Sequence, residues 1–328
     1  MSFYRSIIRQ SFITAWQHKY LWFFGLFATL LASNFEIELL NRFTSQGSTP
    51  YDWQRWSQSG ILSLRTWGNL LELAKTNTGS FISIIILIVV LLILALLLLW
   101  LSVVSQAALV SNINKAALSV NKRQSRHDTA VGFQEGRRYF WPVLWLNILV
   151  RVIVYGLAAA SIVPVMVWSS GQGIIFGLVY LVVFVVFLGV ALALALIAKY
   201  AIAAITLKDQ SFKEAVISSW HLFWNNWLVS LEMAFILFAI SLLATFAIII
   251  VVMIVAIPLV FLYLITLAIG SYVLYIAALA VGVIISLGIV IIGGSIMTVV
   301  QTTAWVTFYN QLSNRKGVQS KIERVFSE

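Results

Sequence analysis

The sequence predicts an all-α, polytopic transmembrane bundle of about six spans. We expect three repeated hairpins, each preceded by an interfacial amphipathic helix. The first observation is composition, since 61% of the 328 residues are hydrophobic and 10% are charged. The second is the length of the runs that hold no Lys, Arg, Asp or Glu: Thr76–Asn114, Val152–Ala198 and Met233–Asn314. About 20 apolar residues cross a bilayer as a helix, so each run is long enough to span.

The third observation is a recurring pattern, which indicates a repeat architecture. Its clearest copy is Ser211–Leu237, which starts polar, gathers tryptophans and continues into an apolar run. A second copy runs from Thr129 to Arg151, and a fainter one opens at Ser11. The spans that return also end alike, with mixed small and polar residues at Ser102–Val110, Ala195–Ala203 and Thr298–Val306. Such residues let helices approach closely and form hydrogen bonds in a membrane.

The whole chain, 1–328, is predicted to be a single integral membrane domain. An interfacial helix at 1–18 is followed by spans at 20–35, 81–104, 139–168, 174–198, 227–257 and 272–309. The segment 41–78 is external, 112–138 is a basic cytoplasmic loop, and 312–328 is a cytoplasmic tail. Between residues 227 and 311 two long helices, interrupted by Pro258 and by Gly270-Ser271, or four short spans fit the length, which leaves six or eight spans in total.

The interfacial helix is predicted from residues 1–18 because apolar side chains recur there at helical spacing. The apolar face holds Phe3, Tyr4, Ile7, Ile8, Phe12, Ala15 and Trp16. The other face is largely polar, with Arg5, Ser6, Arg9, Gln10 and Thr14. We expect this helix to lie in the membrane surface as an anchor, with Trp16 near the headgroups.

The net charge of +10 has a membrane explanation. With six spans and both termini in the cytoplasm, the cytoplasmic segments hold 16 basic and 6 acidic residues, while the external segments balance. The positive-inside rule predicts this distribution, so we assign the chain to a bacterial inner membrane as a multi-pass protein. The basic face would attract anionic lipid headgroups, and nucleic acid is not needed as a partner.

Candidate catalytic and metal-binding residues are scarce. The chain has no cysteine, and its three histidines, His18, His127 and His221, lack further ligands at metal-binding spacing. The motifs HExxH and GxSxG, the P-loop and paired acidic metal ligands do not occur. We therefore expect neither enzymatic activity nor a cofactor or metal.

Two charges within the spans form the candidate polar site. Aligning Tyr139-Phe140-Trp141 with Leu222-Phe223-Trp224 gives an offset of 83, which places Arg151 and Glu232 within two residues of each other in depth. A lone charge in the middle of a bilayer costs at least about 3 kcal/mol, so we predict that the two pair. The pair either fixes the helices or forms a site for a headgroup, an ion or a proton. Lys199 is the alternative partner of Glu232, or it reaches the cytoplasmic interface.

The pattern F-x-x-A…W-x-x-F-W is complete in the third copy, as Phe212, Ala215, Trp220, Phe223 and Trp224. The second copy has Arg137 where the leading Trp would stand. From about residue 5 to 313 the chain resembles uncharacterised bacterial six-helix membrane proteins and the membrane domain fused to some glycerophosphodiester phosphodiesterases. The resemblance implies a fold. It implies no phosphodiesterase activity, because the soluble barrel with its acidic metal site is absent from this sequence.

The sequence thus favours a non-enzymatic envelope module of the inner membrane that associates with lipids or with a partner protein. A small transporter or permease subunit that uses a polar site at Arg151 and Glu232 is the alternative. Against transport, polar residues do not line several spans. An intramembrane enzyme would need clustered histidines or acids that this sequence lacks.

Labelling of single cysteines tests the topology, because the native chain has none. We expect an impermeant thiol reagent to label the Ser57→Cys variant in intact cells and to leave the Ser320→Cys variant unlabelled until the cells are lysed. The reverse pattern would overturn the orientation derived from the positive-inside rule.

Overall fold

The computed structural model describes residues 2–32, 76, 78–118, 129–168 and 174–314. Within these ranges the chain is helical apart from short turns and contains no strand, which confirms the predicted all-α class. Most of the predicted external segment 41–78, the middle of the basic loop 112–138 and most of the tail 312–328 lie outside the described residues. So does part of the first predicted span, 20–35.

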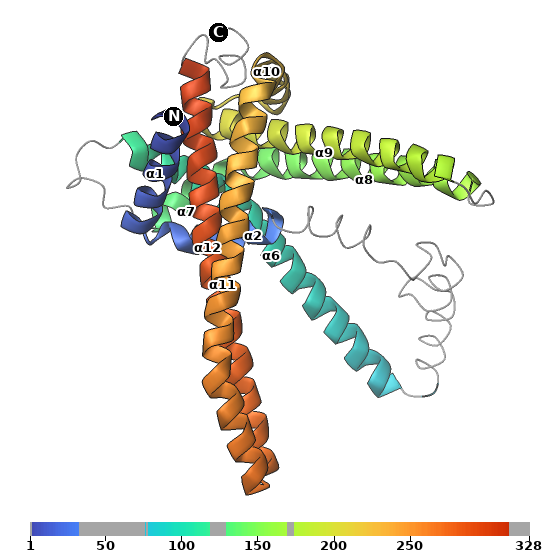
Figure 1. Cartoon of the computed structure of the whole chain (residues 1–328), viewed down its shortest axis with the longest axis vertical. Coiled ribbons are helices and arrows are strands. Elements are labelled where there is room, and N and C mark those ends of the chain that lie inside the picture. The colour runs from blue at the N-terminus through green and yellow to red at the C-terminus, as the bar shows by residue number, and fades with distance from the viewer. Residues whose placement is uncertain (1, 33–75, 77, 119–128, 169–173, 315–328) are drawn as a thin grey trace. The chain divides into compact units, whose positions relative to one another are not determined.

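The helices of the described ranges are shown in chain order by colour in Figure 1. They are α1 (Ser2–Gln17), α2 (Leu21–Ala32), α6 (Thr78–Leu118), α7 (Thr129–Arg138), α8 (Phe140–Trp168), α9 (Ile174–Lys208), α10 (Phe212–Asn225), α11 (Trp227–Ile269) and α12 (Tyr272–Asn314).

Among the described residues, five helices are long and apolar enough to cross a membrane. Their candidate spans are Thr78–Ala116, Phe140–Leu157, Leu181–Lys208, Trp227–Thr266 and Tyr272–Ser313. These agree in place with the second to sixth predicted spans. The first predicted span contains the 12-residue α2, and its remainder is outside the described part of the chain. Six spans therefore stay a prediction.

The last hairpin consists of two long helices. Both α11 and α12 have 43 residues, and the chain reverses between them at Gly270 and Ser271. Gly270 has a φ of 70°, a left-handed conformation that glycine adopts without strain. Pro258 was expected to interrupt the first of these helices, but α11 continues past it to Ile269. A proline is tolerated inside an apolar spanning helix, so the region consists of two long helices and not four short ones, while its number of spans stays a prediction.

The chain divides into two compact units, residues 29–102 and the remainder. In the smaller unit, the part of α6 from Ile82 to Leu99 exposes nearly all of its large apolar side chains. The core of the larger unit contains the C-terminal parts of α6, α9 and α12. Their buried stretches are Val103–Ile113, Leu196–Thr206 and Val299–Leu312, which overlap the three small and polar segments that the sequence singled out in all but the first residue of each segment.

Three short helices, α1, α7 and α10, pack against these stretches; we call them the leading helices. α1 packs on α12, and α10 packs on α9. α7 lies against α6 so closely that a Cβ atom on Gly136 would stand 2.4 Å from the carbonyl oxygen of Val104. Each leading helix ends at a short break, after which α2, α8 or α11 begins. α8 then pairs with α9, and α11 with α12.

The apolar side chains of α1 fall on two sides of the helix. Tyr4, Ile7 and Ala15 are buried, whereas Phe12 and Trp16 are 47% and 64% exposed. The predicted face therefore does not lie in the membrane surface as a whole. Helical periodicity identifies an apolar face, but it does not distinguish a face that meets lipid from one that meets protein.

The contact between α7 and α6 can be tested at Gly136. We expect Gly136→Ala to lower stability in detergent by about 1–3 kcal/mol, because the added methyl group meets backbone that cannot turn away. Thermal unfolding of the purified protein measures this. Gly156 on α8 is the matched control, since a Cβ atom added there would have nothing within 4 Å of it. Gly156→Ala should leave stability unchanged or raise it by up to about 1 kcal/mol. Equal effects of the two variants would contradict the contact.

Candidate functional site

Glu232 lies in the second turn of α11 and is half-buried. The hydroxyl of Tyr4 on α1 donates a hydrogen bond of 2.5 Å to its Oε2 atom. Burial raises the pKa of Tyr4, and the hydrogen bond to Glu232 raises it further, so Tyr4 stays protonated and remains a donor. This contact ties the N-terminal helix to a helix 228 residues away in the sequence.

A second tyrosine binds the same region of α11. Tyr200 of α9 is fully buried, and its hydroxyl donates a hydrogen bond of 2.7 Å to Oγ of Ser230. Oγ of Ser230 in turn donates a bond of 2.7 Å to the carbonyl oxygen of Asn226, at the break before α11. The ring of Tyr200 also contacts three aromatic rings of α12, those of Trp305, Phe308 and Tyr309. Hydrogen bonds and ring contacts together hold α9, α11 and α12 in register.

A corresponding contact joins α6 to α8. The amide of Asn147 on α8 donates a bond of 3.0 Å to Gln106 of α6 and another of 2.8 Å to the carbonyl oxygen of Val143. Asn147 and Ser230 are 83 residues apart, which is the offset that the sequence alignment predicted. Each of them bonds to the carbonyl oxygen four residues earlier and to a side chain of the preceding long helix.

The predicted site residues lie on three helices. Arg151 is exposed on α8, four residues beyond Asn147, and Glu232 receives its hydrogen bond from Tyr4. The ammonium of Lys199 lies 5.0 Å from the centroid of the Trp305 ring, a cation–π contact. The pairing of Arg151 with Glu232 stays a prediction, as does the alternative with Lys199.

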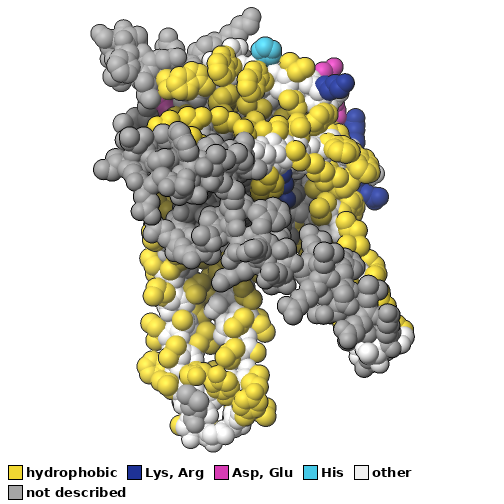
Figure 2. All heavy atoms as spheres, turned by 90° about the vertical axis from the view of Figure 1, so that its right-hand side faces the viewer, with side chains coloured by type: hydrophobic (Ala, Val, Ile, Leu, Met, Phe, Trp, Pro, Cys, Tyr) yellow, Lys and Arg dark blue, Asp and Glu magenta, His cyan; other side chains and the backbone are white. Residues whose placement is uncertain are grey.

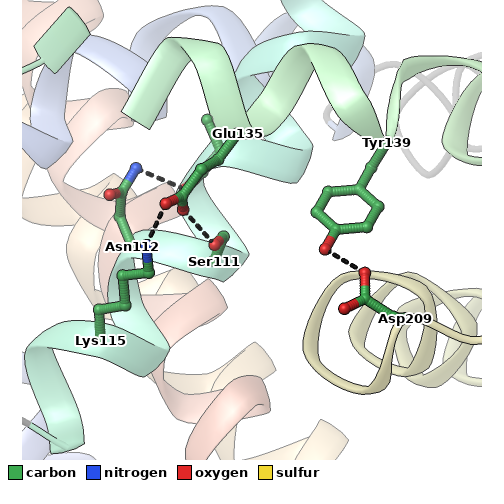
Figure 3. A network of polar contacts seen from close by, with 7 residues as sticks. Ser111, Asn112, Lys115, Glu135, Tyr139 and Asp209 are labelled. Carbon is green, nitrogen blue, oxygen red and sulfur yellow. Dashed lines mark hydrogen bonds and ion pairs between the residues drawn. The ribbon is translucent and has the colours of Figure 1, made fainter. Parts of the chain in front are cut away.

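A separate polar network surrounds the start of α8 (Figure 3). Glu135 of α7 accepts a hydrogen bond of 2.7 Å from Ser111 and forms an ion pair with Lys115, both on α6. Tyr139, at the break between α7 and α8, donates a 2.5 Å bond to Asp209. Burial, reinforced by this bond, raises the pKa of Tyr139 to about 12.

This network was not predicted from the sequence, where Glu135 and Asp209 are two of the charges of cytoplasmic segments. Arg138 adds a contact of 3.3 Å to Asp209, and Asn310 of α12 donates a bond of 2.9 Å to Asn114 of α6. Asp209 also has a φ of 53°, which lets the chain turn sharply between α9 and α10. In the sequence, polar residues next to this turn were the one signal that could have indicated the network.

The polar groups described above connect helices to one another. Within the described ranges, no group of three His, Cys, Asp or Glu residues could hold a metal ion. The hydroxyls of Tyr4, Tyr200 and Ser111 all donate to acceptors on other helices. Each buried polar group that gains such a partner avoids the free energy that an unpaired one would lose in an apolar interior.

Comparison with protein families gives one match. A family of unknown function, DUF7544, matches residues 22–311, almost the whole chain. The chain belongs to this family. The match to DUF7544 includes Glu232, Tyr200 and Asn147 and begins after α1, so Tyr4 lies outside it. Neither the curated proteins nor the solved structures gave a match. The resemblance to membrane domains fused to glycerophosphodiester phosphodiesterases stays a prediction.

The bond between Tyr4 and Glu232 predicts a measurable loss in the Tyr4→Phe variant. A hydrogen bond to a charged group contributes about 1.5–3 kcal/mol, and we expect a loss toward the lower end because Glu232 is partly exposed. Thermal unfolding in detergent measures the change. Tyr155→Phe, at an exposed tyrosine of α8, is the matched control and should have no effect.

A double-mutant cycle separates the possible partners of Glu232. If Tyr4 is its partner, Tyr4→Phe should lower stability less in the Glu232→Gln background than in the native chain. The same cycle with Arg151→Leu tests the predicted ion pair, for which the double variant should recover much of the loss of either single variant. Additive losses in a cycle would exclude the pairing that it tests.

Proposed function

We propose that the protein is a non-enzymatic module of the bacterial inner membrane that associates with membrane lipids. Both termini would face the cytoplasm. The observation that carries this proposal is the exposure of apolar side chains along α6, α9, α11 and α12. In Figure 2 hydrophobic side chains dominate the surface of the long helices. An apolar surface of this extent is stable in contact with acyl chains and would aggregate in water.

We further propose that the chain consists of three copies of one repeat unit, which is not one of the two compact units described above. Each repeat unit is a leading helix, a span out and a span back. The units would be α1-α2-α6, α7-α8-α9 and α10-α11-α12. The leading helix of the second unit packs on α6, and that of the third unit packs on α9. The leading helix of the first unit packs on α12. Each leading helix thus contacts the last helix of another unit, an arrangement that closes into a ring.

Contacts of the outgoing helices support the same ring. Asn147 on α8 bonds to α6, and Ser230 on α11 bonds to α9. In the first unit, the backbone carbonyl of Trp22 on α2 accepts a hydrogen bond from Ser295 on α12. A Cβ atom on Gly25 would stand 2.7 Å from the carbonyl oxygen of Ser295, so α2 and α12 also approach closely. Every outgoing helix therefore has a polar contact with the last helix of the unit before it.

Exposed tryptophans near the helix breaks favour a lipid partner. Six of those in the described ranges are more than half exposed: Trp16, Trp141, Trp145, Trp220, Trp224 and Trp227. Trp is enriched at both membrane–water interfaces, because its ring is apolar while its N–H needs a polar neighbour. The alternative, a transporter that uses Arg151 and Glu232, gains no support from the hydrogen bond of Glu232 to Tyr4, which joins two helices of the protein.

Site-specific fluorescence tests the proposal in the cysteine-free chain. We would attach a fluorophore to Leu243→Cys, an exposed position of α11, or to Lys213→Cys on α10, and reconstitute each into phospholipid nanodiscs. A nitroxide on the acyl chains should quench the probe at position 243. A water-soluble quencher should act on the probe at 213. Equal aqueous quenching at both positions would contradict embedding of α11 in lipid.

A further inference from the structure

We propose that the exposed stripe of α1, formed by Arg5, Arg9, Phe12 and Trp16, binds the headgroup of an anionic phospholipid. This proposal rests on the proposed function and specifies its lipid and its site. The stripe takes Phe12 and Trp16 from the apolar face that the sequence predicts to be membrane-bound and combines them with Arg5 and Arg9 of the polar face, because Tyr4, Ile7 and Ala15 are buried against protein.

The four residues share one face of the helix. Their spacing of four, three and four residues keeps the side chains in line on a helix of 3.6 residues per turn. All four are exposed, and Trp16 has 64% of its surface accessible. From Arg5 to Trp16 the stripe extends over about 17 Å at about 1.5 Å per residue. It therefore presents two guanidinium groups followed by two aromatic rings.

Packing of the opposite face fixes the direction in which the stripe points. Ile7, Ser11 and Ala15 are fully buried, and α1 packs on α12 through this side. Tyr4 adds the hydrogen bond to Glu232 of α11. At the C-terminal end of α1, Nε1 of Trp22 donates a bond of 2.8 Å to the carbonyl oxygen of Ala15. Because the helix is held at both ends, rotation that would bury the stripe would break these contacts.

The composition of the stripe fits an anionic headgroup. Arginine donates two parallel N–H bonds to phosphate oxygens, and α1 contains no acidic residue that would compete for its arginines. Phe12 and Trp16 supply the aromatic surface that prefers the headgroup region over water or the acyl core. Both zwitterionic and anionic phospholipids carry a phosphate. Since the phosphate is common to both classes, net charge distinguishes them, and the two positive arginines favour the anionic phospholipid.

The third leading helix provides an internal comparison. Lys213, Ile217, Trp220 and Trp224 are exposed on α10 with the same spacing of four, three and four residues. The rings of Trp220 and Trp224 stack at 6.0 Å. This stripe has one cation, and Glu214 follows it directly in the chain. It should therefore hold lipid through its aromatic rings with little selectivity for charge.

Native mass spectrometry of the full-length protein tests the proposal. Protein purified in mild detergent would be titrated with phosphatidylglycerol or with phosphatidylcholine, and retained lipids counted. A basic residue near an anionic surface contributes about a five-fold gain in affinity. We therefore expect Arg5→Gln/Arg9→Gln to weaken phosphatidylglycerol binding by about 25-fold and to leave phosphatidylcholine binding unchanged. Arg137→Gln/Lys208→Gln removes the same charge from α7 and α9, outside both stripes, and should retain most of the selectivity.

Each outcome has a distinct meaning. Circular dichroism of the arginine variant should match that of the native protein, because both side chains are exposed. Trp16→Phe, which keeps an aromatic ring, should retain the preference for phosphatidylglycerol. If the native protein prefers phosphatidylglycerol and the arginine variant retains that preference, the assignment to α1 is wrong while the proposed function stands. Equal losses of phosphatidylglycerol affinity in the two double variants would also contradict the assignment of the site to α1. If the native protein retains neither lipid, the proposed function fails as well.

Discussion

Close packing of three helix ends, Val103–Ile113, Leu196–Thr206 and Val299–Leu312, is the constraint on which the larger unit depends. In a membrane, lipid tails are as apolar as leucine, so burying leucine between helices gains little. Small residues such as Ala107, Ala201 and Ala304 instead let backbones approach, and the hydroxyls of Ser111 and Tyr200 then donate hydrogen bonds to neighbouring helices. The leading helices gather around this core because each offers a small residue or a buried polar group to it.

Polar side chains in this fold mark where helices meet. Asn147 reaches Gln106, and Tyr200 reaches Ser230. The carboxylate of Glu232 is held by the hydroxyl of Tyr4. Away from such contacts the long helices are almost purely apolar, and α11 and α12 contact chiefly each other. This division follows from the solvent, because an unpaired polar group facing acyl chains would cost several kcal/mol. Specific interactions are therefore concentrated where the protein, and not lipid, surrounds the side chain.

Much of the fold could be predicted because membrane spans have a strong local signal. Long apolar runs gave the helices α6, α8, α9, α11 and α12, and small residues marked the ends that form the core. Less of the candidate site than of the fold could be predicted from the sequence. Glu232 was recognisable as a rare charge in an apolar run. Tyr4, which donates the hydrogen bond to it, lies 228 residues away in a stretch whose pattern predicts a membrane anchor. The buried face of α1 could not be chosen either, because lipid and protein interiors favour the same apolar side chains.

The docking of α1 on α12 also has a consequence for the order of folding. The ring of Phe3 on α1 contacts that of Phe308 on α12, 305 residues further along the sequence, so α1 cannot dock until α12 has been made. Contacts this distant in sequence are slow to form, because the intervening chain must first be brought together. During synthesis Tyr4, Ile7 and Ala15 would remain uncovered, and chaperones or the membrane surface would have to shield them. The core can be completed only after α12 has been made, and a polypeptide that ends before α12 lacks the surface on which α1 packs.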